Sequence, residues 1–239
     1  MTETRSLTPL ATRYTTEDLR VFTPDEAARF GSDLTEDVAW QLLYRLEPDL
    51  YERLIAGERI HPDVLAWLPA RVSRCVEIAA GTGRLTTTLA PRCDELIAVE
   101  PAAPLRDRLR DRFAGPDVRS GFFDALPVED GWADLVVSCS AFTAANGGEA
   151  GLAEMERVTH PGGTVAFVWP ADVEWLRSHG FEYASFPGDM SIEFSSVDEA
   201  VAIARIFYPH AAEAIRTASV PYDLIGVNPP RDVAWKVTS

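Results

Sequence analysis

The chain has 239 residues, 46% of them hydrophobic and 25% charged, so it can bury at least one substantial core. Its formal net charge of -15 argues against a nucleic-acid surface, because a duplex binder needs a dense basic face. No stretch approaches the ~18 to 20 apolar residues that cross a bilayer, and no secretion leader or membrane anchor is expected.

The cysteines give no sign of a disulfide framework or a zinc site. Cys75, Cys93 and Cys139 are widely spaced and lie in or beside predicted buried strands. This usage fits a reducing compartment, so a cytoplasmic location and no structural metal are expected.

The first part of the chain has helical signals. Residues 1–15 are polar and are expected to be loose or draped over the fold. The segment "TPDE" predicts a helix with Thr23 as N-cap, Pro24 in the first turn and Glu26 completing a capping box. Together with the helices that follow, this predicts an N-terminal helical cap or lid over residues 1–70.

Three more helices are predicted before the first strand. The second covers residues 36–46, where Val38, Leu42, Leu43 and Leu46 recur at helical spacing. The third covers "PDLYERLIAG" and stops at Gly57, and the short fourth, "HPDVLAWLP", ends at Pro69.

From residue 71 to 239 the pattern alternates between strand and helix. Short runs rich in Val, Ile and Phe predict strands over residues 72–79, 95–100, 118–123, 133–140 and 164–170. Helical patterns over 83–92, 103–113 and 150–160 separate several of them, which is typical of a parallel, doubly wound α/β sheet. After Pro170, a helix over 173–181, a capped helix from Ser196 and a terminal pair of strands around 228–231 are expected.

A glycine turn follows the first of these strands. Gly81 and Gly83 remove side chains where backbone can approach a ligand, and a helix is predicted to start near Arg84. A dinucleotide fingerprint would need a third glycine at position 86, which is Thr86 here. It would also leave unexplained Glu77, an acid in a nearly buried strand end, where a charge is costly unless it meets a cation or several donors.

Over residues 72–170 the sequence resembles the class I S-adenosylmethionine-dependent methyltransferases. "VEIAAGTGRLTTTLA" is similar to their first motif, "LIAVEP" to their second strand, "GFFDALPVEDGWADLVVS" to the segment that contacts adenine, and "LAEMERVTHPGGTVAFVW" to their helix and fifth strand. The resemblance implies a Rossmann-like, doubly wound, seven-stranded sheet that binds S-adenosyl-L-methionine and releases S-adenosyl-L-homocysteine.

The resemblance also assigns cofactor-binding residues. Glu77 would orient the methionine end, Gly81 and Gly83 would admit the cofactor, Glu100 would bind the ribose hydroxyls, and Asp124 would accept from the adenine amino group. The further candidates beside them are Ala79, Pro101, Phe123 and Ser140. The sequence departs from the family at Ala79, where a glycine is common.

The sequence gives fewer signals for the methyl-acceptor pocket and for a catalytic base than for the cofactor site. Trp169, Pro170, Ser138, Ser140 and Phe142 end the fifth and fourth strands and are expected to line the methyl-acceptor pocket.

His61 and Tyr14 are candidate bases, although helix N-cap is the simpler role for His61. His160 and His179 are placed at the sheet edge opposite the cofactor, and His210 is unplaced. Asn228 to Pro230 is interpreted as a hairpin connection rather than as a nitrogen-methyltransferase motif.

The sequence thus predicts an enzyme that methylates a small molecule on O, N or C. Its expected partner is the methyl acceptor, without nucleic acid or membrane, and it is expected to be a monomer or homodimer. One alternative is an S-adenosylmethionine-binding protein without methyl transfer. The other is a nicotinamide-dependent oxidoreductase, which Thr86 and Glu77 disfavour.

Overall fold

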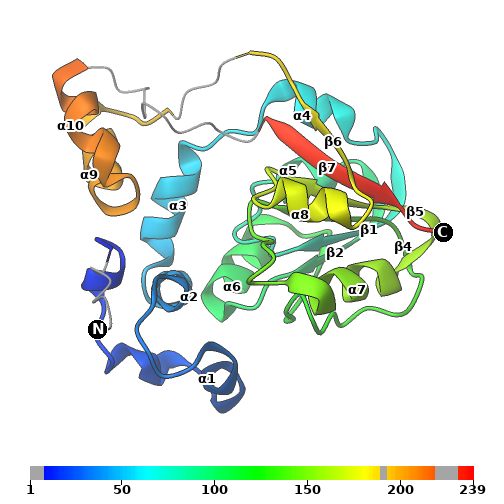
Figure 1. The fold of residues 1–239 in the computed structure, drawn as a ribbon, viewed down its shortest axis with the longest axis horizontal. Helices are drawn as coiled ribbons and strands as arrows, with labels where there is room; N and C mark the ends of the chain where they lie inside the picture. The colour runs from blue at the N-terminus through cyan, green and yellow to red at the C-terminus, as the bar shows by residue number, and fades with distance from the viewer. Residues whose placement is uncertain (1–7, 189–192, 219–230) are drawn as a thin grey trace. The chain divides into compact units, whose positions relative to one another are not determined.

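The computed structural model describes residues 8–188, 193–218 and 231–239 (Figure 1). The chain divides into two compact units, and each is considered by itself. The helical unit comprises residues 1–59 and 191–227, and the sheet unit comprises residues 60–190 and 228–239. Among the described residues, no helix is long and apolar enough to cross a membrane.

The helical unit is a set of short helices around one apolar core. Its elements are η1 (Ala11–Arg13), η2 (Asp18–Val21), α1 (Pro24–Phe30), α2 (Glu36–Leu46), α3 (Pro48–Ala56), α9 (Val197–Phe207) and α10 (Pro209–Ala218). The predicted capping box is confirmed, since Thr23 accepts from the Glu26 backbone and the Glu26 side chain accepts from the Thr23 backbone.

The predicted helix over residues 36–46 is confirmed as α2. Leu10 and Tyr14 are buried, so the described part of the N-terminal segment is draped on the core as expected. Leu46, the last residue of α2, is 42% exposed, whereas Val38, Leu42 and Leu43 are buried.

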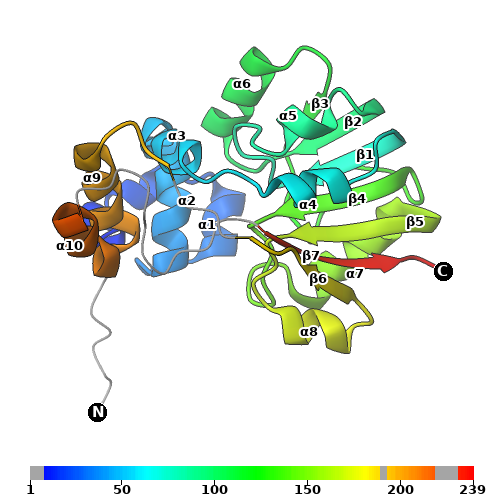
Figure 2. The same ribbon diagram turned by 90° about the horizontal axis from the view of Figure 1, so that it is seen from above.

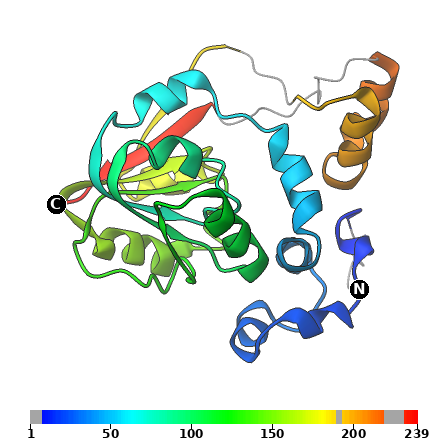
Figure 3. The ribbon, with the colours of Figure 1, turned by 180° about the vertical axis from the view of Figure 1, so that it is seen from behind.

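The division of the chain differs from the predicted boundary after residue 70. The helices α9 and α10 lie side by side (Figure 3), and their apolar residues belong to the same core as those of α2 and α3. Arg53 of α3 also makes two hydrogen bonds to Glu199 of α9, of 2.7 and 2.8 Å. The helical unit therefore draws on two distant segments of chain, whereas α4 (Pro62–Trp67) belongs to the sheet unit.

The sheet unit confirms the doubly wound, seven-stranded prediction. Its strands are β1 (Val72–Ile78), β2 (Cys93–Val99), β3 (Asp117–Arg119), β4 (Ala133–Cys139), β5 (Thr159–Val168), β6 (Glu182–Ser185) and β7 (Asp232–Val237). Their order is β3-β2-β1-β4-β5-β7-β6 (Figure 2), and β7 runs antiparallel to both of its neighbours. The strand order reverses between β1 and β4, where ligands bind in such sheets.

Helices cover both faces of this sheet. On one face, α4 and α5 (Thr86–Leu89) pack against alternate residues of β1, β4 and β5. On the other face, α7 (Gly148–Val158) and α8 (Val173–Ser178) pack against the intervening residues of the same strands. The helix α6 (Ala103–Arg112) connects β2 to β3.

Several element boundaries differ from the sequence prediction. The helix expected near Arg84 begins at Thr86, because Gly81 and Gly83 prolong the turn with φ angles of 59° and 100°. The strand β5 begins at Thr159, and its register with β4 shifts near Ala133. The final strand β7 pairs with β6, while the turn predicted at residues 228–230 lies outside the described residues.

Candidate functional site

The glycine turn lies where β1 ends, at the edge of the sheet that we call the carboxyl edge, because β1, β2, β4 and β5 all end there. Glu100, directly after β2, is hydrogen-bonded to the backbone of this turn. Its Oε2 accepts from the Gly81 backbone N–H at 3.0 Å, and its Oε1 accepts from that of Ala102 at 2.8 Å. The acid predicted to bind ribose therefore also holds the backbone of the turn in place.

Gly83 has a structural reason to lack a side chain. A Cβ atom there would lie 2.3 Å from the Phe113 ring and 3.0 Å from Leu109, and the φ angle of 100° is itself unfavourable for other residues. The turn thus packs directly against α6. The side-chain-free surface expected to face a ligand at this position faces the protein.

Glu77 is the most unusual acid of the site. Only 2% of it is exposed, and its Oε2 accepts a hydrogen bond of 2.5 Å from Thr86 Oγ1. Burial raises its pKa from 4.5 to about 8, against the opposing effects of the Thr86 bond and the Arg84 charge. Thr86, which replaces the third glycine of a dinucleotide fingerprint, therefore holds the acid in place.

Two buried hydroxyls near Glu77 lack hydrogen-bond partners among the described residues. They are Thr82 Oγ1, inside the glycine turn, and Ser138 Oγ, which pairs in register with Ile78 at the end of β1. Both residues are fully buried, and an unsatisfied buried hydroxyl costs about 1–3 kcal/mol. A polar ligand at this edge would supply the missing partners.

Three neighbouring strands end in strained backbone. Ala79 after β1, Ser140 after β4 and Trp169 after β5 have φ angles of 55°, 60° and 56°. The left-handed region costs a non-glycine residue about 1–2 kcal/mol, and a bulky residue there is an outlier. Such strain gathers at functional sites, so it supports this edge as the site.

The sequence-predicted cofactor residues fall into two groups. Glu77, Ala79, Gly81, Gly83, Glu100, Pro101 and Ser140 all lie in or directly after the ends of β1, β2 and β4. Phe123 and Asp124 lie after β3. Asp124 is exposed, whereas Phe123 is buried edge-on against Phe142 with ring centroids 5.1 Å apart. The assigned cofactor contacts of both residues remain predictions.

The two candidate bases are occupied by structural bonds. His61 is the N-cap of α4, where its Nδ1 accepts from the Asp63 backbone N–H at 3.1 Å. Tyr14 belongs to the helical unit and donates to Glu47 Oε1 at 2.8 Å. Burial and this bond raise the pKa of Tyr14 further above its usual value, which disfavours the phenolate that a base would need.

The other histidines also have structural partners. His160 lies near the start of β5, directly after the C-cap of α7, and its Nε2 is 3.1 Å from Asp134 Oδ1. His179 caps the C-terminal end of α8 and pairs with Glu149 at 2.8 Å, which together with its bond to the Trp175 carbonyl raises its pKa. His210 lies in α10.

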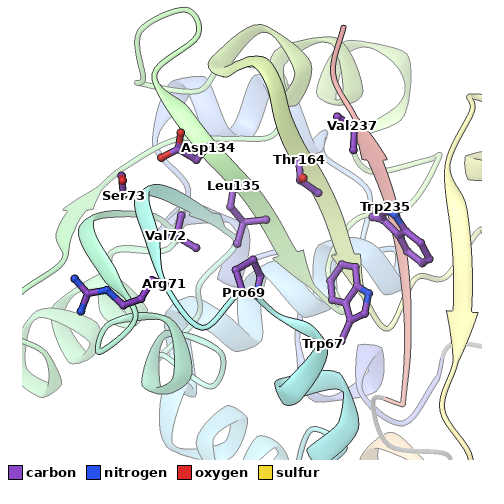
Figure 4. Close-up of a pocket in the computed structure, with 10 residues that line it drawn as sticks. All are labelled: Trp67, Pro69, Arg71, Val72, Ser73, Asp134, Leu135, Thr164, Trp235 and Val237. Carbon is purple, nitrogen blue, oxygen red and sulfur yellow. The ribbon is translucent and has the colours of Figure 1, made fainter.

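A cavity of about 490 Å³ lies at the opposite edge of the sheet (Figure 4). Its lining residues are Trp67, Pro69, Arg71, Val72, Ser73, Asp134, Leu135, Thr164, Trp235 and Val237. The charged groups in it are already paired, Arg71 with Asp94 and Asp134 with both His160 and the Arg74 backbone N–H. No group of three or more potential metal ligands occurs among the described residues.

A doubly wound seven-stranded sheet with an acid on either side of its glycine turn is the arrangement of class I S-adenosylmethionine-dependent methyltransferases, as the sequence predicted. The comparison with known families agrees, because residues 76–167 match the methyltransferase domain family. The match to that family is to this part of the sheet unit.

Curated relatives match parts of the chain. An uncharacterized methyltransferase of Mycobacterium bovis is 32% identical over 50% of this chain and 50% of its own length, so the chain spans about half of that relative. A malonyl-[acyl-carrier protein] O-methyltransferase of Halorhodospira halophila is 30% identical over 69% of this chain and 56% of its own length. An rRNA adenine N-6-methyltransferase of Streptomyces fradiae is 43% identical over 25% of this chain and 20% of its own length.

Solved structures share the fold at low sequence identity. The cyclase SpnF has a TM-score of 0.52 at 14% identity and covers 83% of this chain and 96% of its own. This likeness concerns the fold alone.

Proposed function

We propose that the chain is an S-adenosylmethionine-dependent methyltransferase that acts on a small-molecule acceptor in the cytoplasm. The observation that carries the proposal is Glu77, a carboxyl group that is 2% exposed beside a left-handed glycine turn. Burial without a strong cation raises its pKa to about 8, so a positively charged ligand would stabilise its ionised form. S-adenosylmethionine carries an ammonium and a sulfonium and meets that need.

The residues of the carboxyl edge fit this cofactor in their chemistry. Glu77 would accept from its ammonium group, and Glu100, whose carboxylate oxygens lie beside the glycine turn, would accept from ribose hydroxyls. Thr82 and Ser138 bring the unpartnered hydroxyls that a polar ligand can satisfy. When bound, the cofactor supplies a methyl group on a positively charged sulfur, so the protein has to align the acceptor and exclude water.

The charge of the chain favours a small-molecule acceptor over a nucleic acid. A net charge of -15 disfavours rRNA or DNA as acceptor, because phosphate contacts need basic side chains. The match to an rRNA methyltransferase is confined to 25% of the chain. The acyl-carrier-protein relative raises a protein-bound acceptor as the nearest competitor to a free metabolite. None of the three cysteines forms a disulfide, which supports a reducing compartment.

The experiment is a turnover assay with S-adenosylmethionine and a protein-free extract of small metabolites. We expect S-adenosylhomocysteine to accumulate with the extract and not without it. Accumulation only when carrier protein is added would replace the small-molecule acceptor by a protein-bound one. Tight binding without any product would instead favour a cofactor-binding protein that does not transfer methyl groups.

The oxidoreductase alternative is tested by comparing the binding of S-adenosylhomocysteine with that of nicotinamide cofactors. Thr86 occupies the position of the third glycine and is hydrogen-bonded to Glu77, which leaves no glycine there for a pyrophosphate. We therefore expect the thermal unfolding midpoint to rise with S-adenosylhomocysteine and to remain unchanged with NAD or NADP. A rise with a nicotinamide cofactor alone would contradict the proposal.

A further inference from the structure

Asp232 is an acid of the carboxyl edge that sequence patterns did not mark. It begins β7, which runs antiparallel to β5, so the start of β7 lies at the end of β5. The Asp232 carbonyl accepts from the Trp169 backbone N–H at 2.9 Å. Asp232 is therefore next to one of the strained strand ends that we expect to line the acceptor pocket.

The Asp232 carboxyl group is positioned by a neighbouring strand. The Tyr183 hydroxyl of β6 donates to its Oδ2 at 2.9 Å, and within the described residues Tyr183 is the one side chain that donates to it. The Arg177 guanidinium lies 5.1 Å from the centroid of the Tyr183 ring, and the Arg231 charge acts on the carboxyl group. Burial raises the pKa of Asp232 in spite of Tyr183 and Arg231, and a raised pKa makes a carboxylate a better proton acceptor.

The other acids of this edge are committed to structural bonds. Glu77 is held by Thr86, and Glu100 accepts from two backbone N–H groups. Asp172, shortly after β5, accepts from the Ala144 backbone N–H at 2.7 Å. Asp232 is partly buried like Asp172, but its carboxyl group is positioned by the Tyr183 side chain rather than by a backbone N–H, and burial raises its pKa.

We propose that Asp232, positioned by Tyr183, takes the proton of the methyl acceptor, and that the acceptor therefore carries a hydroxyl or amine group. This inference rests on the proposed methyltransferase function. As the bond from the acceptor O or N to the methyl carbon forms, the carbon–sulfur bond breaks and its electron pair stays on sulfur. The acceptor's O–H or N–H proton passes to the Asp232 carboxylate and leaves from there to water.

The test uses S-adenosylmethionine labelled with 13C in the methyl group, together with the protein-free metabolite extract. The chemical shift of the transferred carbon tells whether it is bound to O, N, C or S. We expect O- or N-methyl products from the wild type. D232N should reduce the rate by about 100-fold or more, the usual contribution of a general base, with unchanged affinity for S-adenosylmethionine. D134N, an acid of the opposite edge, is the matched control and should retain the wild-type rate.

The variant Y183F tests the positioning residue separately. Without the phenol, the pKa of Asp232 should rise, because a bond that favours its ionised form is lost. The acid limb of the rate against pH should move to higher pH, with little change in the rate above that limb. A purely structural role would lower the rate equally at all pH values.

The outcomes separate this inference from the proposed function. If the wild type binds S-adenosylmethionine but D232N transfers methyl groups within a few-fold of it, Asp232 is not the base. A methyl group found on carbon or sulfur, or no transfer by a wild type that binds the cofactor, also overturns the inference. Failure of the wild type to bind S-adenosylmethionine would instead remove the proposed function itself.

Discussion

The two edges of the sheet differ in whether their buried polar groups have hydrogen-bond partners. At the edge opposite the glycine turn there is an open cavity, yet Asp134 already accepts from the Arg74 backbone and pairs with His160. At the carboxyl edge, Glu77 has a raised pKa, and the Thr82 and Ser138 hydroxyls have no partners among the described residues. The hydrogen-bonding groups without partners among the described residues therefore lie at the carboxyl edge, which is the basis for proposing the site there rather than in the open cavity.

Backbone strain separates the edges in the same way. The non-glycine residues with positive φ in the described chain are Ala79, Ser140 and Trp169, and all three follow strands at the carboxyl edge. Strain of this kind persists only where the surrounding packing enforces it. The following variants test whether residues of the carboxyl edge destabilise the folded chain through tight packing, a buried acid and backbone strain.

Among the glycine and alanine substitutions, Gly83→Ala should have the largest effect on stability. The new Cβ would lie 2.3 Å from Phe113 at a φ angle of 100°, so overpacking and backbone strain together should lower the unfolding free energy by about 3 kcal/mol. Gly115→Ala is the matched control, because a Cβ there meets nothing within 4 Å. Denaturant unfolding measures both, and equal stability of the two variants would contradict the packing described for the turn.

The raised pKa of Glu77 should make the stability of the folded chain depend on pH. Its pKa is raised from 4.5 to about 8 in the folded chain, so its contribution to stability is fully present below pH 4.5. That contribution falls as the pH rises from 4.5 to about 8, by at most about 1.4 kcal/mol per pH unit. Unfolding of the wild type and Glu77→Gln across this range should show a decline that the variant lacks. Parallel curves would mean that Glu77 is ionised without a ligand.

Ala79→Gly should have the smallest effect, with the opposite sign. Glycine adopts the φ angle of 55° without strain, so the variant should gain about 0.5–1 kcal/mol of stability in spite of its greater freedom when unfolded. Ala80→Gly, one residue on and outside the left-handed region, should lose stability instead. A loss of stability in both variants would show that the conformation of Ala79 is not strained.

Local signals were enough to predict most elements. Thr23 and Glu26 formed the capping box, Ser196 capped α9, and His61 took the N-cap role that seemed simpler than catalysis. Glu77 was singled out because a charge in a buried strand end has few explanations, whereas Glu100 was assigned only by the family resemblance. The family resemblance then predicted the sheet that surrounds them.

Features that depend on distant parts of the chain were not predicted. The packing of α6 and Phe113 against Gly83 was not predicted, because no local pattern shows that contact. The pairing of Tyr183 with Asp232 arises from the antiparallel β6 and β7, which only the tertiary structure brings together. The same holds for α9 and α10, whose apolar faces complete a core begun more than a hundred residues earlier.

Calorimetric titration with S-adenosylmethionine tests the central claim most directly, with one acid changed at each edge. We expect the wild type and Asp134→Asn to bind with the same affinity. Glu77→Gln should bind about 30-fold more weakly, the loss of about 2 kcal/mol typical for a hydrogen bond to a charged group. Wild-type affinity in Glu77→Gln, or no heat of binding in the wild type, would contradict the account.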